Sequence, residues 1–504
     1  MARGRWRSTA RTGWGGAGGL APRRRATAFA TLREALLSSP TFLEGFLAGA
    51  LAGRFFALAP VLPFDVTPLG SNVVPPPCQS KSLKVLKIHG RLDLSSMMEG
   101  ELTSCEEAQA RILDACRPLA PEWAGLEDAL GRALAEPVVA HVSQPPWNNS
   151  AMDGYALRSE DVARPPSRLR VIEAIFAGQL PTRPVGRGEA ARIMTGAPLP
   201  EGASAVVMQE RTRALEGPGL GEVEVLDAVP SGSNVREAGE DARAGETLLP
   251  EGTALGIPEL ALLSGQGLTR VSVPRRPRVA ILATGDELCA PDALSPGKIV
   301  DTNTLALALA VQRAGGIPRR LGIARDTLED VERLLGPALD ADAVLTSAGM
   351  SVGERDFVRT AFDRLGVRSE FFGVAIKPGK PFAFARRGST LVFGLPGNPT
   401  SSMVVFELFV RPALRRLLGL SEVLPTPVSA RSAVELRKKP GLAHFVRVRA
   451  SYQDGELWAE PLASQTSGAV RSAASATHLL HFPREAISLP RGAQVRLYPV
   501  SWSP

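Results

Sequence analysis

The spacing of apolar residues changes twice along the chain, near residues 138 and 274. Ser104 and Glu107 form a capping-box pattern, and the apolar residues that follow recur at helical spacing. A second helix is predicted over 126–136, where Pro137 would end it. From 138 to 274, short alternating runs separated by Gly and Pro are typical of β structure.

Beyond residue 274, short apolar runs alternate with amphipathic segments. The predicted strand and helix pairs are 279–283 with 302–314, 343–346 with 355–365 and 391–395 with 401–418, and a further helix is predicted over 328–339. This order predicts a mainly parallel sheet with helices on both faces, whose ligands bind beyond the carboxyl ends of the strands. After a linker at 424–427, the remaining residues indicate a small β domain.

The formal charge of +7 would favour a nucleic-acid or anionic-membrane partner if it were spread over the protein. Residues 1–97 carry 13 Lys and Arg against 4 Asp and Glu, whereas residues 98–504 carry 45 against 47. We therefore expect no nucleic-acid partner. The apolar stretch 42–64 contains Glu44, Arg54 and two prolines, so no membrane span is expected either.

Residues 1–97 are interpreted as an Arg-rich extension that is disordered or not native, because Met97 and Met98 stand directly before the first predicted helix. The alternative is organellar targeting, since residues 1–33 are rich in Arg and contain no acid. The four cysteines lack C-x-x-C spacing. This argues against a zinc site or a disulfide framework and favours a reducing, cytoplasmic compartment.

Three predicted strands end in turns rich in Gly and hydroxyl residues, at 284–288, 346–356 and 394–401. Small residues and helix N-termini let backbone N–H groups approach an anion. A fourth segment, 377–381, places Lys377 and Lys380 three residues apart on a loop stiffened by two prolines, and two such close ammonium groups favour a bound oxyanion. Each loop alone is equally consistent with a capped turn, but together they indicate an anion pocket.

The acids Asp286, Glu287 and Asp356 follow the same strands and would hold a hard cation such as Mg²⁺ against phosphate oxygens. Segments 150–156 and 193–200 show no catalytic pattern, and no Ser-His-Asp set is visible. From its residues alone, the chain is predicted to be a phosphate- or oxyanion-binding α/β enzyme that uses Mg²⁺.

These segments, in this order, resemble the molybdopterin molybdenumtransferase (molybdenum insertase) family, which includes the C-terminal domain of gephyrin. The resemblance runs from about residue 100 to about 500 and rests on motifs at 150–156, 193–200, 284–288, 347–356, 377–381 and 394–399. It implies that adenylylated molybdopterin and molybdate react in the presence of Mg²⁺ to give the loaded cofactor and AMP. Two rivals stay open: molybdopterin adenylyltransferase, which shares the α/β domain, and a non-catalytic scaffold of the gephyrin type.

The resemblance implies a multidomain α/β plus β fold. Its parts are a helical N-terminal domain (98–144 and 242–274), an inserted β domain (145–241), a three-layer α/β molybdopterin-binding domain with a mainly parallel sheet (275–420) and a C-terminal β-barrel (421–504). It further implies a cytoplasmic homodimer, with molybdopterin adenylyltransferase and cofactor-accepting enzymes as partners.

Site residues are carried over by motif from the same resemblance. The catalytic positions that it implies are Asp153, Thr195, Glu287, Asp326, Asp356, Lys377 and Lys380, with Asp153, Glu287 and Asp356 as metal ligands. The substrate-binding positions that it implies are Arg236, Asp241, Thr284, Gly285, Ser347, Gly349, Ser351, Gly353, Pro396, Gly397, Asn398, Pro399, Arg447 and Ser467. Molybdate, a tetrahedral dianion, would be bound by Lys377, Lys380, Arg447 and Ser467 through charge-assisted hydrogen bonds.

The chain departs from the family pattern at three places. Ala348 stands where the family often has Gly, and Thr327 replaces a second acid after Asp326. Thr327 is expected to cap the following helix. The segment 441–444, which ends in His444, lacks one cation and one acid near the implied molybdate site.

Overall fold

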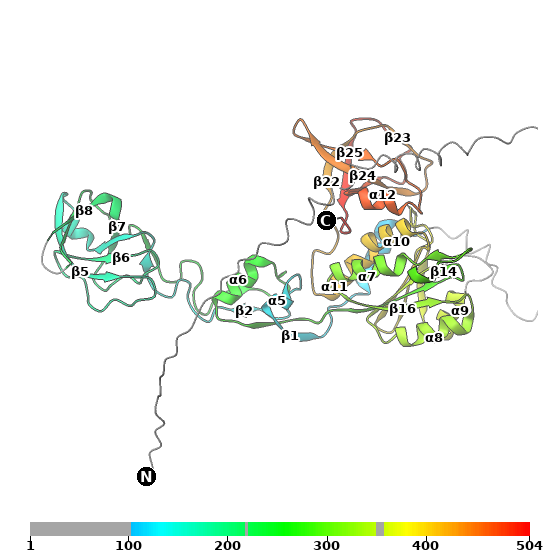
Figure 1. Cartoon of the computed structure of the whole chain (residues 1–504), viewed down its shortest axis with the longest axis horizontal. Helices are drawn as coiled ribbons and strands as arrows, with labels where there is room; N and C mark the ends of the chain where they lie inside the picture. The colour runs from blue at the N-terminus through cyan, green and yellow to red at the C-terminus, as the bar shows by residue number, and fades with distance from the viewer. Residues whose placement is uncertain (1–101, 217–219, 349–356, 504) are drawn as a thin grey trace, which may run out of the picture. The chain divides into compact units, whose positions relative to one another are not determined.

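The computed structural model describes residues 102–216, 220–348 and 357–503 of the chain (Figure 1). The expected Arg-rich extension, residues 1–97, lies outside the described residues. The first described helix is α4 (Cys105–Asp114). The Ser104 hydroxyl accepts a hydrogen bond of 3.0 Å from the Glu107 backbone N–H, which confirms the predicted N-cap.

The helix predicted over 126–136 is wrong in its length, because α5 covers only Leu126–Ala129. Leu130 adopts a ψ of 128° and Gly131 a φ of +77°, and neither angle continues a right-handed helix. The side chain of Arg132 is buried and its Nε donates to the Pro274 carbonyl at 3.0 Å. The chain therefore turns back over the strand that ends at Pro274.

Segments before and after the β-rich region share one small core. Strand β1 (Pro121–Gly125) pairs antiparallel with β12 (Arg270–Pro274), β2 (Val138–Val139) pairs with β11 (Thr247–Leu249), and α6 (Ile257–Gly265) packs beside them. The residues that form this core are Ala124, Ala129, Leu134, Leu255, Leu263, Val271 and Val273. The β-rich region between them is therefore an insertion in the chain.

The inserted region forms one six-stranded sheet in the order β7-β4-β6-β5-β9-β8. Its strands are β4 (Gly154–Leu157), β5 (Ser167–Ile175), β6 (Glu189–Ile193), β7 (Ala205–Met208), β8 (Thr212–Leu215) and β9 (Glu222–Val225). A separate pair, β3 (Asn149–Ser150) and β10 (Val235–Arg236), joins the two ends of the region. The prediction of β structure here is confirmed.

A second six-stranded sheet has the order β16-β13-β17-β21-β20-β18. Its strands are β13 (Arg278–Thr284), β16 (Ile317–Ala324), β17 (Ala343–Ser347), β18 (Arg368–Phe372), β20 (Ala383–Arg387) and β21 (Thr390–Leu395). Strands β16, β13, β17 and β21 run parallel, whereas β20 and β18 pair antiparallel at one edge. The sheet is therefore mixed. The sequence predicted β13, β17 and β21, whereas β16, β18 and β20 were not predicted.

Helices cover both faces of this sheet, as the alternation of strands and helices predicted (Figure 1). Ile281 of β13 packs with Leu307 of α7 (Asn303–Arg313) on one face. On the opposite face of the sheet, the next residue, Leu282, packs with Leu335 of α8 (Leu328–Ala338) and with α9 (Phe357–Arg364). Successive residues of a strand point to opposite faces, so one apolar run serves both cores.

The helix predicted over 401–418 consists of three parts: α10 (Pro399–Val405), a π-helical turn (Phe406–Val410) and α11 (Arg411–Leu417). Pro412 has no backbone N–H, so the carbonyl of Leu408 has no α-helical donor at that position. The Gln109 side chain of α4 donates to this carbonyl at 3.0 Å. A contact between distant parts of the chain thus compensates the interruption.

The C-terminal part forms a closed β-barrel. Its sheet has the order β19-β24-β25-β22-β28-β26, and an additional pairing of β24 with β26 closes it. The strands are β19 (Ile376–Lys377), β22 (Val428–Ser432), β24 (Ala443–Gln453), β25 (Glu456–Pro461), β26 (His478–Phe482) and β28 (Gln494–Pro499), with α12 (Val470–Ser475) between them. Since β19 pairs with β24, the Lys377 segment is attached directly to the barrel.

None of the helices in the described ranges is long and apolar enough to cross a lipid bilayer.

Candidate active site

The three Gly-rich turns begin at the carboxyl ends of three neighbouring parallel strands, β13, β17 and β21. Ser347 ends β17, and its register partner Leu395 ends β21. The Asn303 side-chain amide donates to the Ser347 hydroxyl and to the Gly397 carbonyl, each at 2.7 Å. Asn303, at the start of α7, therefore connects the turn that follows β17 to the turn that follows β21. Sequence reasoning missed this residue, whose signal was a polar side chain at the beginning of a predicted helix.

Ala348 adopts a φ of +73°, a conformation that favours glycine. Its backbone N–H donates to the Leu395 carbonyl at 3.1 Å. A Cβ at Gly397 would lie 3.1 Å from the Cβ of Ala348. The family departure at position 348 therefore places a methyl group at a crowded contact between two turns.

We expect Ala348→Gly to increase the free energy of unfolding by about 0.5–1 kcal/mol. The left-handed conformation costs an L-residue roughly 1–2 kcal/mol, and the greater unfolded-state freedom of glycine offsets part of this gain. Chemical denaturation with a fluorescence readout measures the difference. A decrease in stability would contradict this account of the turn.

The first turn carries Gly285 and Glu287. Gly285 has a φ of +146°, and the Glu287 carboxylate oxygens lie 2.5 and 2.7 Å from where a Cβ at 285 would be. A Cβ at position 285 would require the Glu287 side chain to move. The glycine therefore allows the Glu287 carboxylate to pack directly against the backbone of its own turn.

Carboxylates from two strand ends lie together. The Asp286 N–H donates to Asp326 Oδ2, and the Asp326 N–H donates to Asp286 Oδ1, both at 3.3 Å. Asp286 and Glu287 are exposed and Asp326 is half-buried. The described residues contain no group of three His, Cys, Asp or Glu arranged for a metal. Mg²⁺ commonly uses one or two carboxylates plus substrate phosphates, so this pair fits the ion chemically.

Four predicted site residues, Gly349, Ser351, Gly353 and Asp356, lie outside the described residues. Their roles stay predictions.

The two lysines of the fourth segment line a cavity of about 490 Å³. The lining residues are Ile376, Lys377, Pro378, Gly379, Lys380, Pro381, Ser401, Leu442, Gln465, Thr466 and Ser467. Lys377 and Lys380 are exposed, and the lining contains no carboxylate. Three of the four residues implied for molybdate, Lys377, Lys380 and Ser467, therefore meet in one cationic cavity.

Arg447, the fourth, is not among the lining residues and is fully buried. Its guanidinium donates to Ser472 Oγ and Thr400 Oγ1, both at 3.2 Å, and to the carbonyls of Ser464 and Thr466 at 3.1 and 3.0 Å. Thr400 Oγ1 in turn donates to the Ser467 carbonyl at 2.7 Å. In this structure Arg447 thus holds the 464–467 segment against α10, and its predicted contact with substrate stays a prediction.

His444 stands opposite Lys377 in the pairing of β19 with β24. Burial, together with the charges of Lys377, Lys438 and Arg447, lowers the pKa of His444 to about 4. The imidazole is therefore neutral at pH 7. Lys377 has no carboxylate partner among the described residues.

Asp153 and Thr195 meet in the inserted sheet. Asp153 Oδ1 accepts hydrogen bonds from the Thr195 backbone N–H and from its hydroxyl, both at 2.7 Å. These two bonds lower the pKa of the exposed Asp153 carboxyl, the hydroxyl having the largest effect. In the described ranges, no hydrogen bond or ion pair joins this pair to the strand-end turns.

We expect Thr195→Val to raise the pKa of Asp153 towards its ordinary value, because the hydroxyl bond is lost and only the backbone bond remains. The folded-state pKa is now depressed, so the pair stabilises the fold above the unfolded pKa and loses this effect as the pH falls. NMR titration of the Asp153 carboxyl measures the shift. An unchanged pKa would contradict the assignment of the main cause to the hydroxyl.

The remaining predicted residues of the inserted region lie near its end, Arg236 on β10 and Asp241 in the chain that follows it. Arg236 pairs through β10 with Asn149, and the Asp241 N–H donates to the Gln144 carbonyl at 3.0 Å. Both Arg236 and Asp241 are exposed.

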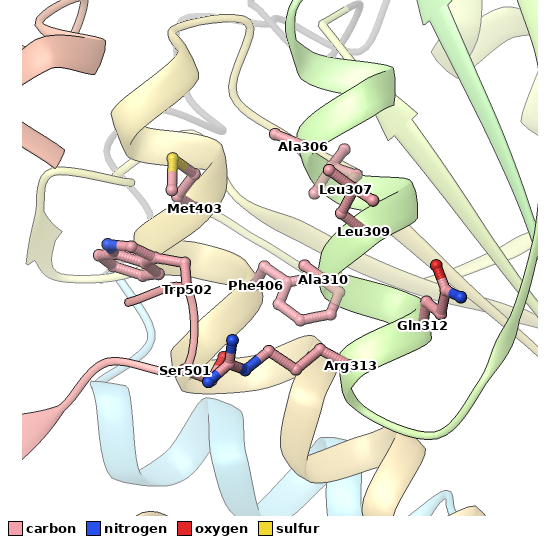
Figure 2. Close-up of a pocket in the computed structure, with 10 residues that line it drawn as sticks. All are labelled: Ala306, Leu307, Leu309, Ala310, Gln312, Arg313, Met403, Phe406, Ser501 and Trp502. Atoms are coloured by element: carbon pink, nitrogen blue, oxygen red, sulfur yellow. The ribbon is translucent and has the colours of Figure 1, made fainter. Parts of the chain in front are cut away.

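A different cavity, of about 570 Å³, lies between α7, α10 and the chain end (Figure 2). Figure 2 shows the Trp502 and Phe406 rings, Met403 and Leu309 around it, with Arg313 at one side. Trp502 Nε1 donates to the Ala473 carbonyl at 3.1 Å, which fixes the ring. No predicted site residue lines this apolar cavity.

Comparison with known proteins covers almost all of the described residues. Residues 103–267 match the MoeA N-terminal region (domain I and II), 280–416 match a probable molybdopterin binding domain, and 429–500 match the MoeA C-terminal region (domain IV). A Bacillus subtilis protein named molybdopterin molybdenumtransferase is 37% identical over 388 residues, covering 75% of this chain and 89% of the relative. A relative of the same name from Nostoc sp. is 42% identical over 353 residues, covering 65% of this chain and 80% of the relative.

The fold comparison agrees with these matches. The crystal structure of a molybdopterin biosynthesis MoeA protein from Pyrococcus horikoshii OT3 aligns with a TM-score of 0.69 and 31% identity. The alignment covers 79% of this chain and 100% of that structure. The chain therefore belongs to the MoeA family, which includes the molybdopterin molybdenumtransferases.

Proposed function

We propose that this enzyme is a molybdopterin molybdenumtransferase, which inserts molybdenum from molybdate into adenylylated molybdopterin and releases AMP. The observation that carries the proposal is the cavity where Lys377, Lys380 and Ser467 lie together without a carboxylate. Two ammonium groups and a hydroxyl provide charge-assisted hydrogen bonds for a tetrahedral dianion. The matches to named molybdopterin molybdenumtransferases support the same reaction.

Molybdate would be held by Lys377 and Lys380, whose exposed ammonium groups keep their donors free for an anion. The Ser467 hydroxyl adds a neutral donor, and Arg447 fixes the segment that carries it. The neutral His444 beside Lys377 contributes no negative charge that would compete with the substrate. Positioning and electrostatic stabilisation then supply the catalysis, so no nucleophile is required.

The strand-end turns would hold the phosphate-bearing substrate. Backbone N–H groups at the ends of β17 and β21 would face phosphate oxygens, and Asn303 links Ser347 of the turn after β17 to Gly397 of the turn after β21. Mg²⁺, when bound, neutralises phosphate charge as AMP leaves. Our proposed ligands are Glu287 with Asp153 and Asp356, and the paired Asp286 and Asp326 are further oxygen donors that fit.

Other features of the proposal rest on family membership. We propose that the chain has four domains after residue 97. The first combines residues 98–144 with 242–274, and the others are 145–241, 275–420 and 421–504. The spans of the three family matches support this division. We further propose a cytoplasmic homodimer that works with molybdopterin adenylyltransferase and with cofactor-accepting enzymes.

Reconstitution tests the activity. Purified full-length protein, adenylylated molybdopterin, Mg²⁺ and micromolar molybdate should release AMP, and release should depend on molybdate. Absence of molybdate-dependent AMP, while a known enzyme is active in the same assay, would exclude the proposed reaction. Formation of adenylylated molybdopterin from ATP would instead favour the adenylyltransferase rival, whereas inactivity in both assays would favour a scaffold.

A further inference from the structure

A polar cavity of about 470 Å³ lies beside α11, at the start of the linker that leads to the barrel. Its lining residues are Ala254, Arg411, Arg415, Leu420, Ser421, Glu422, Leu424, Pro425, Thr426, Pro499, Val500 and Ser501. It shares no lining residue with the cationic cavity around Lys377. The proposed reaction therefore leaves this cavity without a role.

Two arginines occupy one face of α11 at this cavity. Arg411 and Arg415 are four residues apart, a spacing that places like charges side by side and disfavours the helix. Arg411 Nη1 donates to Glu407 Oε1 at 3.0 Å, and Glu407 is fully buried. The other Glu407 oxygen accepts from the Ser501 N–H and hydroxyl. The charge of Arg411 is therefore compensated by a buried carboxylate.

Arg415 lacks such compensation. It is half-buried, and its Nη2 donates to the Glu422 carbonyl at 3.2 Å. In the described ranges no carboxylate oxygen lies within 4 Å of its guanidinium. Burial, followed by the charge of Arg411, lowers the pKa of Arg415, which shows that the cation is held at a cost. Arg415 lines the cavity together with the hydroxyl residues Ser421 and Thr426, whereas the Ser501 hydroxyl is already bonded to Glu407. The lining includes one acid, Glu422, which forms no ion pair with Arg415.

The lining indicates the class of ligand. A guanidinium fork with nearby hydroxyl groups matches the several oxygens of a phosphate better than a single acceptor. The other side of the cavity is apolar, formed by Leu420, Leu424, Pro425, Pro499 and Val500. The volume is in the range of small-molecule sites, whereas an inorganic oxyanion would fill only a part of it. We propose that this cavity binds a small organic phosphate monoester, with Arg415 as its principal anion contact.

Calorimetric titration of the full-length protein tests this site, with AMP, adenosine and inorganic phosphate as probes and no molybdate present. AMP should bind more tightly than inorganic phosphate, and adenosine should bind at least tenfold more weakly than AMP. Arg415→Gln should weaken AMP binding about tenfold or more, because the charge-assisted hydrogen bonds from the guanidinium to the phosphate are lost. Arg415→Lys, which keeps the charge but loses the fork, should restore part of the affinity.

Two controls distinguish binding at this cavity from a general effect of charge and from the proposed reaction. Arg437→Gln removes an exposed arginine outside the cavity and should leave AMP binding unchanged. The Arg415→Gln protein should still release AMP in a molybdate-dependent manner, so failure of this proposal is distinguishable from failure of the proposed function. The proposal is overturned if Arg415→Gln binds AMP as the unmodified protein does, if adenosine binds as well as AMP, or if neither phosphate probe binds.

Discussion

Lys377→Gln should reduce molybdate-dependent AMP release by about 100-fold or more, the usual effect of removing one preorganised charged donor from an oxyanion site. Lys377 is exposed at the cavity, and no carboxylate lines that cavity to neutralise it. The loss should appear mainly as a higher molybdate concentration for half-maximal rate, together with a lower maximal rate. Quantifying AMP over a molybdate series measures both.

Lys439→Gln is a matched control for this variant. Lys439 is exposed, lies in the barrel part of the chain and is not among the cavity residues. Its replacement changes the net charge equally but should alter the rate less than twofold, since screened surface charges act weakly. Both variants should unfold at temperatures close to that of the unmodified protein. Equal rates for the two variants would refute the assignment of the oxyanion site to Lys377.

Three strands and the helices of the α/β part could be predicted because these elements have local signals, whereas the strands at 317–324, 368–372 and 383–387 were missed. Apolar runs such as 279–283 and 343–346 have the length of buried strands, and amphipathic segments follow them. The failures lie where a local signal was ambiguous or absent. Apolar spacing over 126–136 looked helical, yet Gly131 adopts a positive φ and the helix ends before it.

The residue types of the candidate site could be predicted from the sequence, but the hydrogen bonds that hold these residues in place could not. Lys377, Lys380 and Ser467 could be assigned from motifs, and the structure brings them to one cavity. The burial of Arg447 could not be foreseen, because its acceptors lie between 17 and 47 residues away in the chain. Asn303 was not predicted as a site residue because its two hydrogen-bond partners, Ser347 and Gly397, are also distant in the chain.

Gly154→Ala should disrupt the inserted sheet next to Asp153. A Cβ at position 154 would lie 1.8 Å from the Val207 carbonyl oxygen and 3.1 Å from the Met208 Cα. Both atoms are backbone of β7, which pairs with β4 at this point, so neither can rotate away. Relief of the collision requires separation of the two strands. We expect a loss of about 3 kcal/mol or more of local stability, the upper range for overpacking.

Hydrogen exchange of the backbone amides in β4 and β7 resolves this effect without assuming that the whole chain unfolds in one step. A loss of about 3 kcal/mol corresponds to roughly 100-fold faster exchange, while amides of the barrel should be unaffected. Gly125→Ala is the control, because Gly125 has a φ of −59° and no atom within 4 Å of an added Cβ. Its stability should change by less than about 1 kcal/mol. Unaltered exchange in β4 and β7 of Gly154→Ala would refute the predicted collision with β7.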